Sequence, residues 1–139
     1  MPKVSEVMTK NPYSVSTTAT LNHAAEVMRD REIGDVLVVR EDGSLCGLVT
    51  DRDLVVRGLA DGLDPRSAAI EEICNHDPVT VSSDQSAEQA VKVMREHKIR
   101  RLPVVDGGDL VGIISLGDLA IEKDPKSVLA DISKAPANN

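Results

Sequence analysis

The pattern of apolar and polar positions predicts one amphipathic helix in each half of the chain. In the first half, apolar residues recur at spacings of three and four positions: Leu21, Ala24, Ala25 and Met28. The same spacing returns in the second half: Ala87, Ala90, Val91 and Met94. Thr20 and Ser86 precede these runs and are typical helix caps, and Gln89 completes the sequence of a capping box with Ser86. The first helix is expected to end at Gly34.

Short continuous apolar stretches after each helix predict two strands joined by a glycine-containing turn. The predicted strand pairs are 36–39 with 45–49 and 102–105 with 110–114. Pro103 has no N–H to donate, so we expect it at the start of a strand or in an edge strand. A brief strand before each helix and a second helix after each hairpin complete the pattern, at residues 13–15, 79–81, 50–59 and 115–122.

The two halves of the chain are similar in sequence and form an internal repeat. Pro12, Met28 and Ile33 recur 66 residues later as Pro78, Met94 and Ile99. The sequence therefore predicts an α/β (α+β) fold of two β-α-β-β-α repeats, at residues 3–62 and 63–123. Each repeat is expected to have a short lead-in helix, at residues 3–8 and 67–74. Residues 124–139 are expected to form a tail with a short helix at residues 126–134.

The composition argues against nucleic acid and membrane as partners. The 139 residues carry a net charge of −7, and Tyr13 is their only aromatic residue. Negative charge repels a phosphate backbone, and single-stranded nucleic acid is usually bound by stacking on aromatic rings. No apolar run approaches the roughly 20 residues that cross a bilayer, and the N-terminus has no apolar leader. We therefore expect a cytoplasmic protein.

The cysteines and histidines give no predicted metal site. Cys46 and Cys74 are expected to be reduced structural thiols, because disulfides are rare in the cytosol. Cys74 and His76 are close in sequence and stay an alternative as a zinc site, although two ligands fall short of the three or four that zinc takes from a protein. No residues pair as nucleophile and base, so no catalytic residues are predicted and the protein is not expected to be an enzyme.

One seven-residue pattern is the strongest local indication of function. It consists of Gly, two aliphatic residues, Thr or Ser, two variable residues and Asp, and it occurs at 47–53 and 112–118. A hydroxyl three positions before a carboxylate, where a strand meets a helix, is a variant of the capping box. The same residues also suit a nucleoside. A helix N-terminus attracts phosphate, Asp accepts hydrogen bonds from ribose hydroxyls, and Gly leaves the strand open to a flat base. Spacing alone leaves both interpretations open.

With these patterns the chain resembles a tandem pair of CBS domains, the module named after cystathionine β-synthase. The resemblance covers about residues 3–134 and is most specific in the two seven-residue patterns and in two further strings, Val7-Met8-Thr9 and Ile99-Arg100-Arg101-Leu102-Pro103-Val104-Val105-Asp106. It implies two repeats packed about a pseudo-two-fold axis. It also implies two clefts between them that commonly bind AMP, ADP, ATP or S-adenosylmethionine.

The resemblance also implies roles for particular residues. Asp53 and Asp118 would each hold a ribose, with Thr50 and Ser115 near the ribose or its phosphate. The brief strands would offer backbone groups to the base, at Tyr13, Val15, Val79, Thr80 and Val81. Basic residues stand where family members place cations that face phosphate, at Arg52, Arg100 and Arg101. A solvated basic face is the alternative interpretation of these arginines.

The two repeats differ in the charges near these positions. Two arginines of the second repeat have uncharged or acidic counterparts in the first: Arg100 and Arg101 against Gly34 and Asp35. In the family, the residue before the Asp of one repeat reaches the opposite cleft, which would assign Arg52 to the cleft of Asp118. The Asp118 cleft is therefore expected to favour charged nucleotides more than the Asp53 cleft does.

Two functions follow from the resemblance. The first is a regulatory module that senses an adenosine compound and acts on a separate, unidentified effector protein, with no obligatory cofactor. The alternative is a structural module that works as a homodimer without a bound nucleotide. A homodimer is expected in either case.

Overall fold

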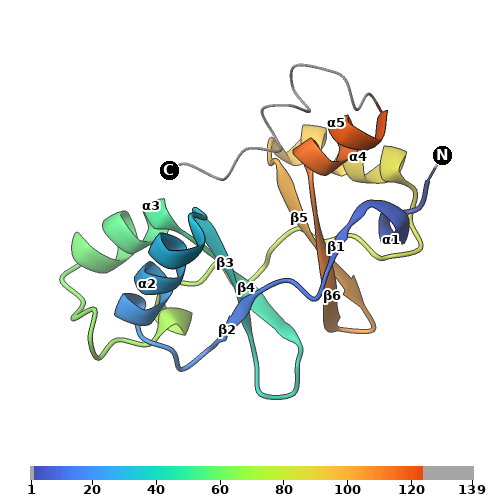
Figure 1. Ribbon diagram of the computed structural model, residues 1–139. Helices are drawn as coiled ribbons and strands as arrows, with labels where there is room; N and C mark the ends of the chain where they lie inside the picture. Colours follow the sequence, from blue (N-terminus) through green and yellow to red (C-terminus); the bar gives the residue numbers. More distant parts are fainter. Residues whose placement is uncertain (1, 124–139) are drawn as a thin grey trace. The chain divides into compact units, whose positions relative to one another are not determined.

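The computed structural model describes residues 2–123, which form two compact units (Figure 1). The first, here called the Asp53 unit, contains residues 13–78, and the second, the Asp118 unit, contains residues 2–12 and 79–123. The N-terminal lead-in therefore packs with the second hairpin, and the lead-in of the second repeat packs with the first hairpin. The fold is mixed α/β, as predicted. The predicted tail, residues 124–139 with its helix at 126–134, lies outside the described residues.

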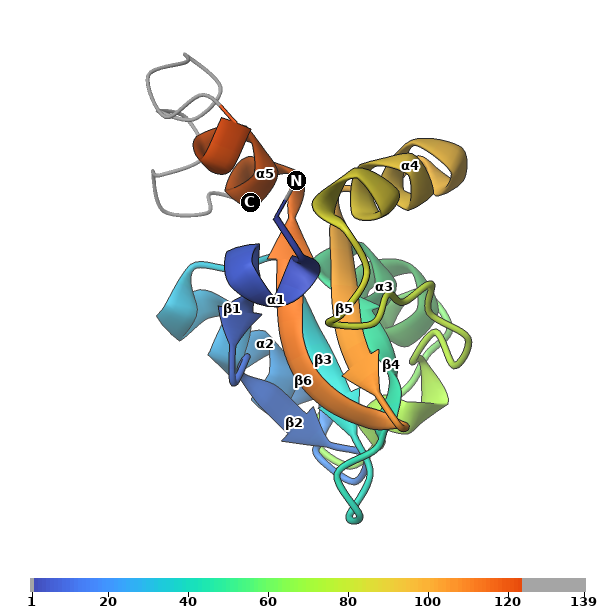
Figure 2. The same ribbon diagram turned by 90° about the vertical axis from the view of Figure 1, so that its right-hand side faces the viewer.

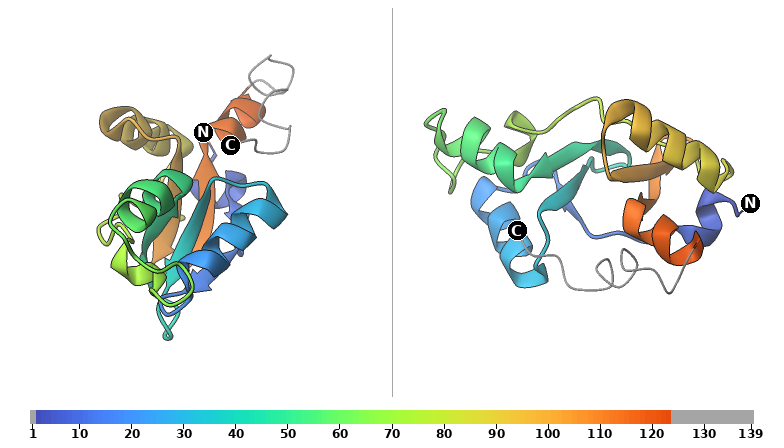
Figure 3. Two further views of the ribbon diagram at one scale, coloured as in Figure 1. Left: turned by 90° about the vertical axis from the view of Figure 1, so that its left-hand side faces the viewer. Right: turned by 90° about the horizontal axis from the view of Figure 1, so that it is seen from above.

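The Asp53 unit contains a three-stranded sheet in the order β2-β3-β4. The strands are β2 (Ser14–Ser16), β3 (Asp35–Val39) and β4 (Leu45–Thr50), and β2 is parallel to β3 whereas β4 is antiparallel to it. The helices are α2 (Leu21–Arg31), α3 (Asp51–Asp53), the π-helix η1 (Leu54–Leu59) and the single 3-10 turn η2 (Ile70–Glu72). Helix α2 packs on β3 and contacts η1 (Figure 3). The predicted helix at 50–59 is thus divided into a short α-turn and a π-helix.

The Asp118 unit contains an antiparallel sheet in the order β1-β6-β5 (Figure 2). The strands are β1 (Thr9–Lys10), β5 (Arg101–Asp106) and β6 (Asp109–Ser115), and the helices are α1 (Val4–Val7), α4 (Ala87–His97) and α5 (Leu116–Lys123). Pro103 lies in β5, an edge strand, as predicted. The predicted strand at residues 79–81 is reduced to one parallel bridge between Val81 and Val104.

The main helices begin at the predicted caps, but α2 ends before Gly34, and among the described hydrogen bonds none joins the Gln89 side chain to the Ser86 N–H, so the predicted capping box is not formed. The hydroxyls of Thr20 and Ser86 accept hydrogen bonds from the backbone N–H groups three residues later, at 3.1 Å in both cases. Helix α2 ends at Arg31 and not at Gly34, because Glu32 adopts a left-handed conformation with φ of 55°. This turn lets the Ile33 N–H reach the carbonyl of Met28 at 3.0 Å and closes the helix end.

The predicted core face of helix α2 is also wrong at one residue. Ala25 is exposed, whereas Val27, which was not part of the predicted face, is buried. Among the helices that the structure describes, none has the length and apolar character needed to cross a membrane.

Each unit has its own apolar core, and both cores depend on a lead-in segment. Ile70 belongs to the core of the Asp53 unit and Val4 to the core of the Asp118 unit. Both residues have an exposed fraction of 0%, and they occupy equivalent positions in the two repeats. The helices that carry them, η2 and α1, are shorter than the predicted lead-in helices at 67–74 and 3–8. The lead-ins are thus structural parts of the units and not linkers.

Candidate functional site

Both seven-residue patterns span the point where a strand meets a helix, and both form complete capping boxes. In the Asp53 unit, the Thr50 N–H donates to Asp53 Oδ2 at 2.9 Å, and the Asp53 N–H donates to Thr50 Oγ1 at 3.1 Å. In the Asp118 unit, the Ser115 N–H donates to Asp118 Oδ2 at 2.9 Å, and the Asp118 N–H donates to Ser115 Oγ at 3.0 Å. The capping interpretation of the pattern is therefore confirmed.

Capping leaves part of each carboxylate available. Asp53 and Asp118 are half-buried, and each uses Oδ2 to accept from the backbone. Among the hydrogen bonds of the described residues, none is accepted by Oδ1 of either side chain. A carboxylate held by its own backbone, with one oxygen still unused, is a rigid acceptor for an external hydroxyl group. The capping and ligand-binding interpretations are thus compatible.

The glycines of the two patterns have a structural role that the sequence analysis missed. A Cβ at Gly47 would collide with the backbone oxygen of Asn75 and the sulfur of Cys74. A Cβ at Gly112 would lie 2.5 Å from the Met8 sulfur and 2.9 Å from the Thr9 backbone oxygen. The lead-in segment of each unit thus occupies the space beside the glycine. The expectation that these glycines leave the strand open to a base is wrong.

Substitution of Gly47 by Ala should therefore destabilise the protein, by at least about 1–3 kcal/mol for overpacking. Gly112→Ala should cost less, because its closest neighbour is the flexible Met8 side chain, whereas Gly47 faces rigid backbone at Asn75. Urea unfolding of the two variants measures both effects. A Gly47→Ala variant as stable as the unmodified protein would contradict this packing role.

Two of the three predicted arginines lie beside the Ser115–Asp118 junction. Arg101 is the direct partner of Ser115 in the pairing of β5 with β6, and the Leu116 N–H donates to the Arg100 carbonyl at 2.8 Å. Both arginines are exposed. Arg52 is exposed on α3, in the Asp53 unit, next to Asp53 in sequence.

The corresponding positions of the Asp53 unit carry no such positive charge. Asp35 is the direct partner of Thr50 in the pairing of β3 with β4, and the Asp51 N–H donates to the Gly34 carbonyl at 2.9 Å. The charge difference expected from the sequence is therefore located immediately beside the two capping boxes.

The segments predicted to contact a base are only partly accessible. Tyr13 is exposed, and the guanidinium of Arg31 lies 3.8 Å from the centre of its ring, a cation–π contact. The side chains of Val15 and Val81 are buried in the two cores. The N–H and carbonyl of Val81 are both bonded to β5, through Pro103 and Val105.

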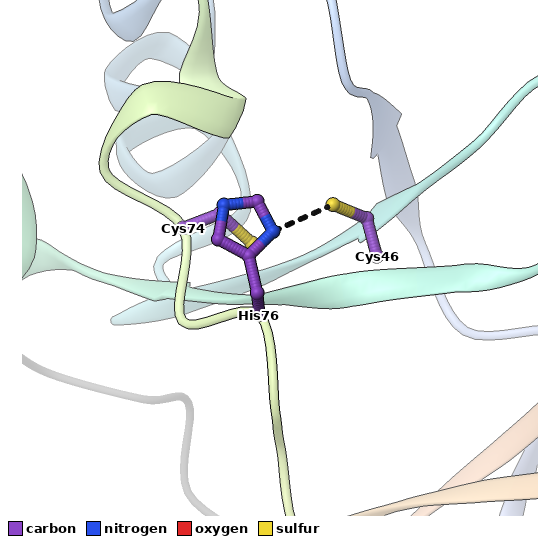
Figure 4. A group of neighbouring side chains, drawn as sticks. All are labelled: Cys46, Cys74 and His76. Atoms are coloured by element: carbon purple, nitrogen blue, oxygen red, sulfur yellow. Dashed lines mark hydrogen bonds between the residues drawn. The ribbon is translucent and has the colours of Figure 1, made fainter.

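Sequence analysis identified only two residues, Cys74 and His76, of one cluster, which Figure 4 shows in the Asp53 unit. The ligand atoms of Cys46, Cys74 and His76 all lie within 4.8 Å of one another. Cys46 is the extra residue of a β-bulge in β4, since Val38 pairs with Gly47 and Val39 with Leu45. Gly47 was the available indication in the sequence, because its missing Cβ admits Cys74 and Asn75 against β4. Burial raises the pKa of the Cys74 thiol to about 12, and the adjacent Cys46 contributes to the shift.

Comparison with known proteins identifies the repeat. The model of the CBS domain family matches twice, at residues 4–58 and 70–123. The CBS domain-containing protein YhcV of Bacillus subtilis is 39% identical over 123 residues, which cover 88% of this chain and 86% of YhcV.

Two solved structures are similar over most of the chain. A crystal structure of hypoxic response protein I with two coordinated zinc ions has 36% identity and a TM-score of 0.79, and the match covers 86% of this chain and 97% of the other. Hypoxic response protein 1 is a protein of Mycobacterium tuberculosis. The CBS domain protein PAE2072 of Pyrobaculum aerophilum, complexed with AMP, has 28% identity and a TM-score of 0.75, and the match covers 96% of this chain and 100% of the other.

Proposed function

This chain belongs to the CBS-domain family, and we propose that it is a regulatory module that binds an adenosine compound through Asp118. The observation that carries the proposal is the Asp118 carboxylate, which the capping box holds in place while Oδ1 remains unused. The complex of a similar CBS domain protein with AMP supports an adenosine ligand. Ser115 would lie near the ribose or phosphate, and Val79 and Thr80 would offer backbone groups to the base.

The charges beside the junction support a phosphorylated ligand. Arg100 directly precedes strand β5 and Arg101 begins it, and both side chains are exposed beside the Ser115 end of β6, where their positive charge favours a phosphate. The equivalent site at Thr50 and Asp53 has Asp35 in place of a cation. We propose that Asp53 serves a second and weaker site, and that Arg52 adds positive charge near a bound phosphate.

We further propose that the module acts in the cytoplasm on a separate effector protein and is not itself an enzyme. The two CBS matches account for nearly all of the described residues, which supports a binding role and not catalysis within them. The ligand would bind one of two conformations of the protein more tightly than the other, and its binding would therefore shift the protein toward that conformation.

Thermal unfolding with a panel of ligands tests the proposal. AMP, ADP, ATP or S-adenosylmethionine at about 100 times its dissociation constant should stabilise the folded protein by about 2.7 kcal/mol, which raises the midpoint by several degrees. GMP at the same concentrations is the matched control for the base, and adenosine is the control for the phosphate. A midpoint that no adenosine compound raises above the GMP value would contradict the proposal.

A structural module that dimerises is the second candidate function, and exposed apolar residues favour it. Val55, Val56 and Leu59 of η1 have exposed fractions of 57%, 44% and 61%. Two of them line a shallow depression of about 380 Å³ together with Asp51 and Arg52. Sedimentation equilibrium of the unmodified protein and of Val55→Glu measures this association. A dimer that Val55→Glu dissociates, in a protein that no adenosine compound stabilises, would favour this function over the first.

A further inference from the structure

We propose that Cys46, Cys74 and His76 bind one zinc ion, or a transition-metal ion of similar ligand preference, in the Asp53 unit. Two sulfur atoms and one imidazole nitrogen form a donor set typical of zinc, whereas magnesium and calcium prefer oxygen. The side chains come from strand β4 and from the segment that follows η2, and they converge on one point (Figure 4).

The distances between the ligand atoms fit a tetrahedral ion. Zinc binds sulfur at about 2.3 Å and nitrogen at about 2.1 Å, so two ligands at the tetrahedral angle lie about 3.6 Å apart for S and N, and about 3.8 Å apart for two S atoms. In the protein, Cys46 Sγ lies 3.5 Å from His76 Nδ1, and all three ligand atoms lie within 4.8 Å of one another. An ion therefore needs only a small movement of the side chains.

The hydrogen bonds of His76 prepare the ring for a metal. Its Nε2 lies 2.9 Å from the backbone oxygen of Glu71, and because a carbonyl only accepts, Nε2 carries the proton. In the tautomer with the proton on Nε2, the lone pair lies on Nδ1, the atom that faces Cys46 Sγ. A metal-bound histidine usually donates its other N–H to a carbonyl or carboxylate in this way.

Two of the three ligands are buried, which distinguishes this cluster from a chance grouping of surface residues. Cys46 and Cys74 have exposed fractions of 3% and 1%, whereas His76 is exposed. Packing of two small apolar thiols in a core explains the cysteines alone. It does not explain an oriented imidazole nitrogen beside them. Three protein ligands leave the fourth tetrahedral position to water or to an added ligand.

The Asp118 unit provides an internal comparison. By the repeat, the counterparts of Cys46, Cys74 and His76 are Val111, Met8 and Lys10. Valine and lysine offer no zinc ligand of this type, and a thioether is a poor ligand for zinc compared with a thiolate. We therefore expect one ion per chain, bound in the Asp53 unit.

Titration of the reduced, metal-free protein with Co²⁺, followed by competition with Zn²⁺, tests the proposal. One equivalent of Co²⁺ should produce the d–d bands of tetrahedral cobalt and thiolate charge-transfer bands, and Zn²⁺ should abolish them. His76→Gln and Cys74→Ser should weaken binding more than about 100-fold, since loss of even an outer-sphere partner costs about 10–100-fold. Because His76 is exposed, His76→Gln should fold even if the buried Cys74→Ser variant does not.

His23→Gln and Lys10→Ala are the matched controls, because both residues are exposed and lie outside the cluster. Both controls should bind Co²⁺ and Zn²⁺ as the unmodified protein does. Absence of the thiolate bands, or equal affinity in the unmodified protein and in His76→Gln, would overturn the proposal. A second outcome would also overturn the proposal. The reduced protein is mixed with zinc and exposed to air, and mass spectrometry then finds Cys46 and Cys74 joined by a disulfide.

Discussion

Replacement of Ile70 by Ala should lower the free energy of unfolding by about 2–5 kcal/mol, the usual cost of emptying a fully buried aliphatic site. The residue lies in a 3-10 turn with an exposed fraction of 0% and belongs to the core of the Asp53 unit. Its N–H also donates to the Ala19 carbonyl at 2.7 Å, so the turn is fixed to the entry of helix α2. Urea unfolding with a two-state fit measures the loss.

Val4 is the counterpart of Ile70 in the Asp118 unit, so the two alanine variants should destabilise different units. Its N–H donates to the Gln85 carbonyl at 2.8 Å, just as Ile70 bonds to Ala19. Native-state hydrogen exchange should therefore show that Ile70→Ala opens residues 13–62, whereas Val4→Ala opens residues 79–123. Val4→Ala should cost less, because truncation to alanine removes one carbon atom fewer from valine than from isoleucine.

Lys92→Ala is the control for these variants, because Lys92 is exposed on helix α4 and its truncation should leave stability nearly unchanged. Faster exchange of residues 79–123 than of 13–62 in Ile70→Ala would contradict the division of the chain into these two units.

Local patterns predicted the parts of the fold that depend on neighbouring residues. The helix starts at Thr20 and Ser86, both hairpins and the edge position of Pro103 follow from caps, periodicity and the missing N–H of proline. The predicted end of α2, at Gly34, was wrong. A left-handed Glu32 ends the helix earlier, and this conformation is less common than a glycine cap and has no sequence marker. The partner of each lead-in was not evident, because two similar lead-ins fit two similar hairpins.

The candidate sites divide in the same way. Thr50 with Asp53, and Ser115 with Asp118, are three residues apart, so their mutual hydrogen bonds could be predicted from spacing alone. The cluster of Cys46 with Cys74 and His76 depends on a bulge in β4 and on a lead-in that crosses Gly47. Neither feature is visible as a spacing, so only the close pair of Cys74 and His76 could be identified from the sequence.

Asp118→Asn should weaken the binding of an adenosine nucleotide by about 10- to 150-fold, the equivalent of a hydrogen bond of about 1.5–3 kcal/mol to a charged group. Asparagine keeps a carbonyl oxygen that can accept from the Ser115 N–H, so the cap should survive. It replaces the second carboxylate oxygen with an NH₂ group, which cannot accept from a ribose hydroxyl. Asp118→Ala is the poorer test, because it also removes the carboxylate that accepts from the Ser115 N–H in the capping box. Isothermal titration calorimetry with AMP and ATP measures the affinities.

Asp53→Asn is the matched variant that separates ribose binding from the proposed inequality of the two sites. It makes the same chemical change at an equivalent capping box, but beside Asp35 instead of Arg101. A phosphorylated ligand should prefer the junction with the arginines, so Asp53→Asn should reduce the tighter affinity much less than Asp118→Asn does. Equal losses in the two variants would refute the inequality and leave ribose binding intact. An Asp118→Asn protein that binds as tightly as the unmodified one would refute the role of the unused oxygen, because the capping box alone then accounts for the carboxylate.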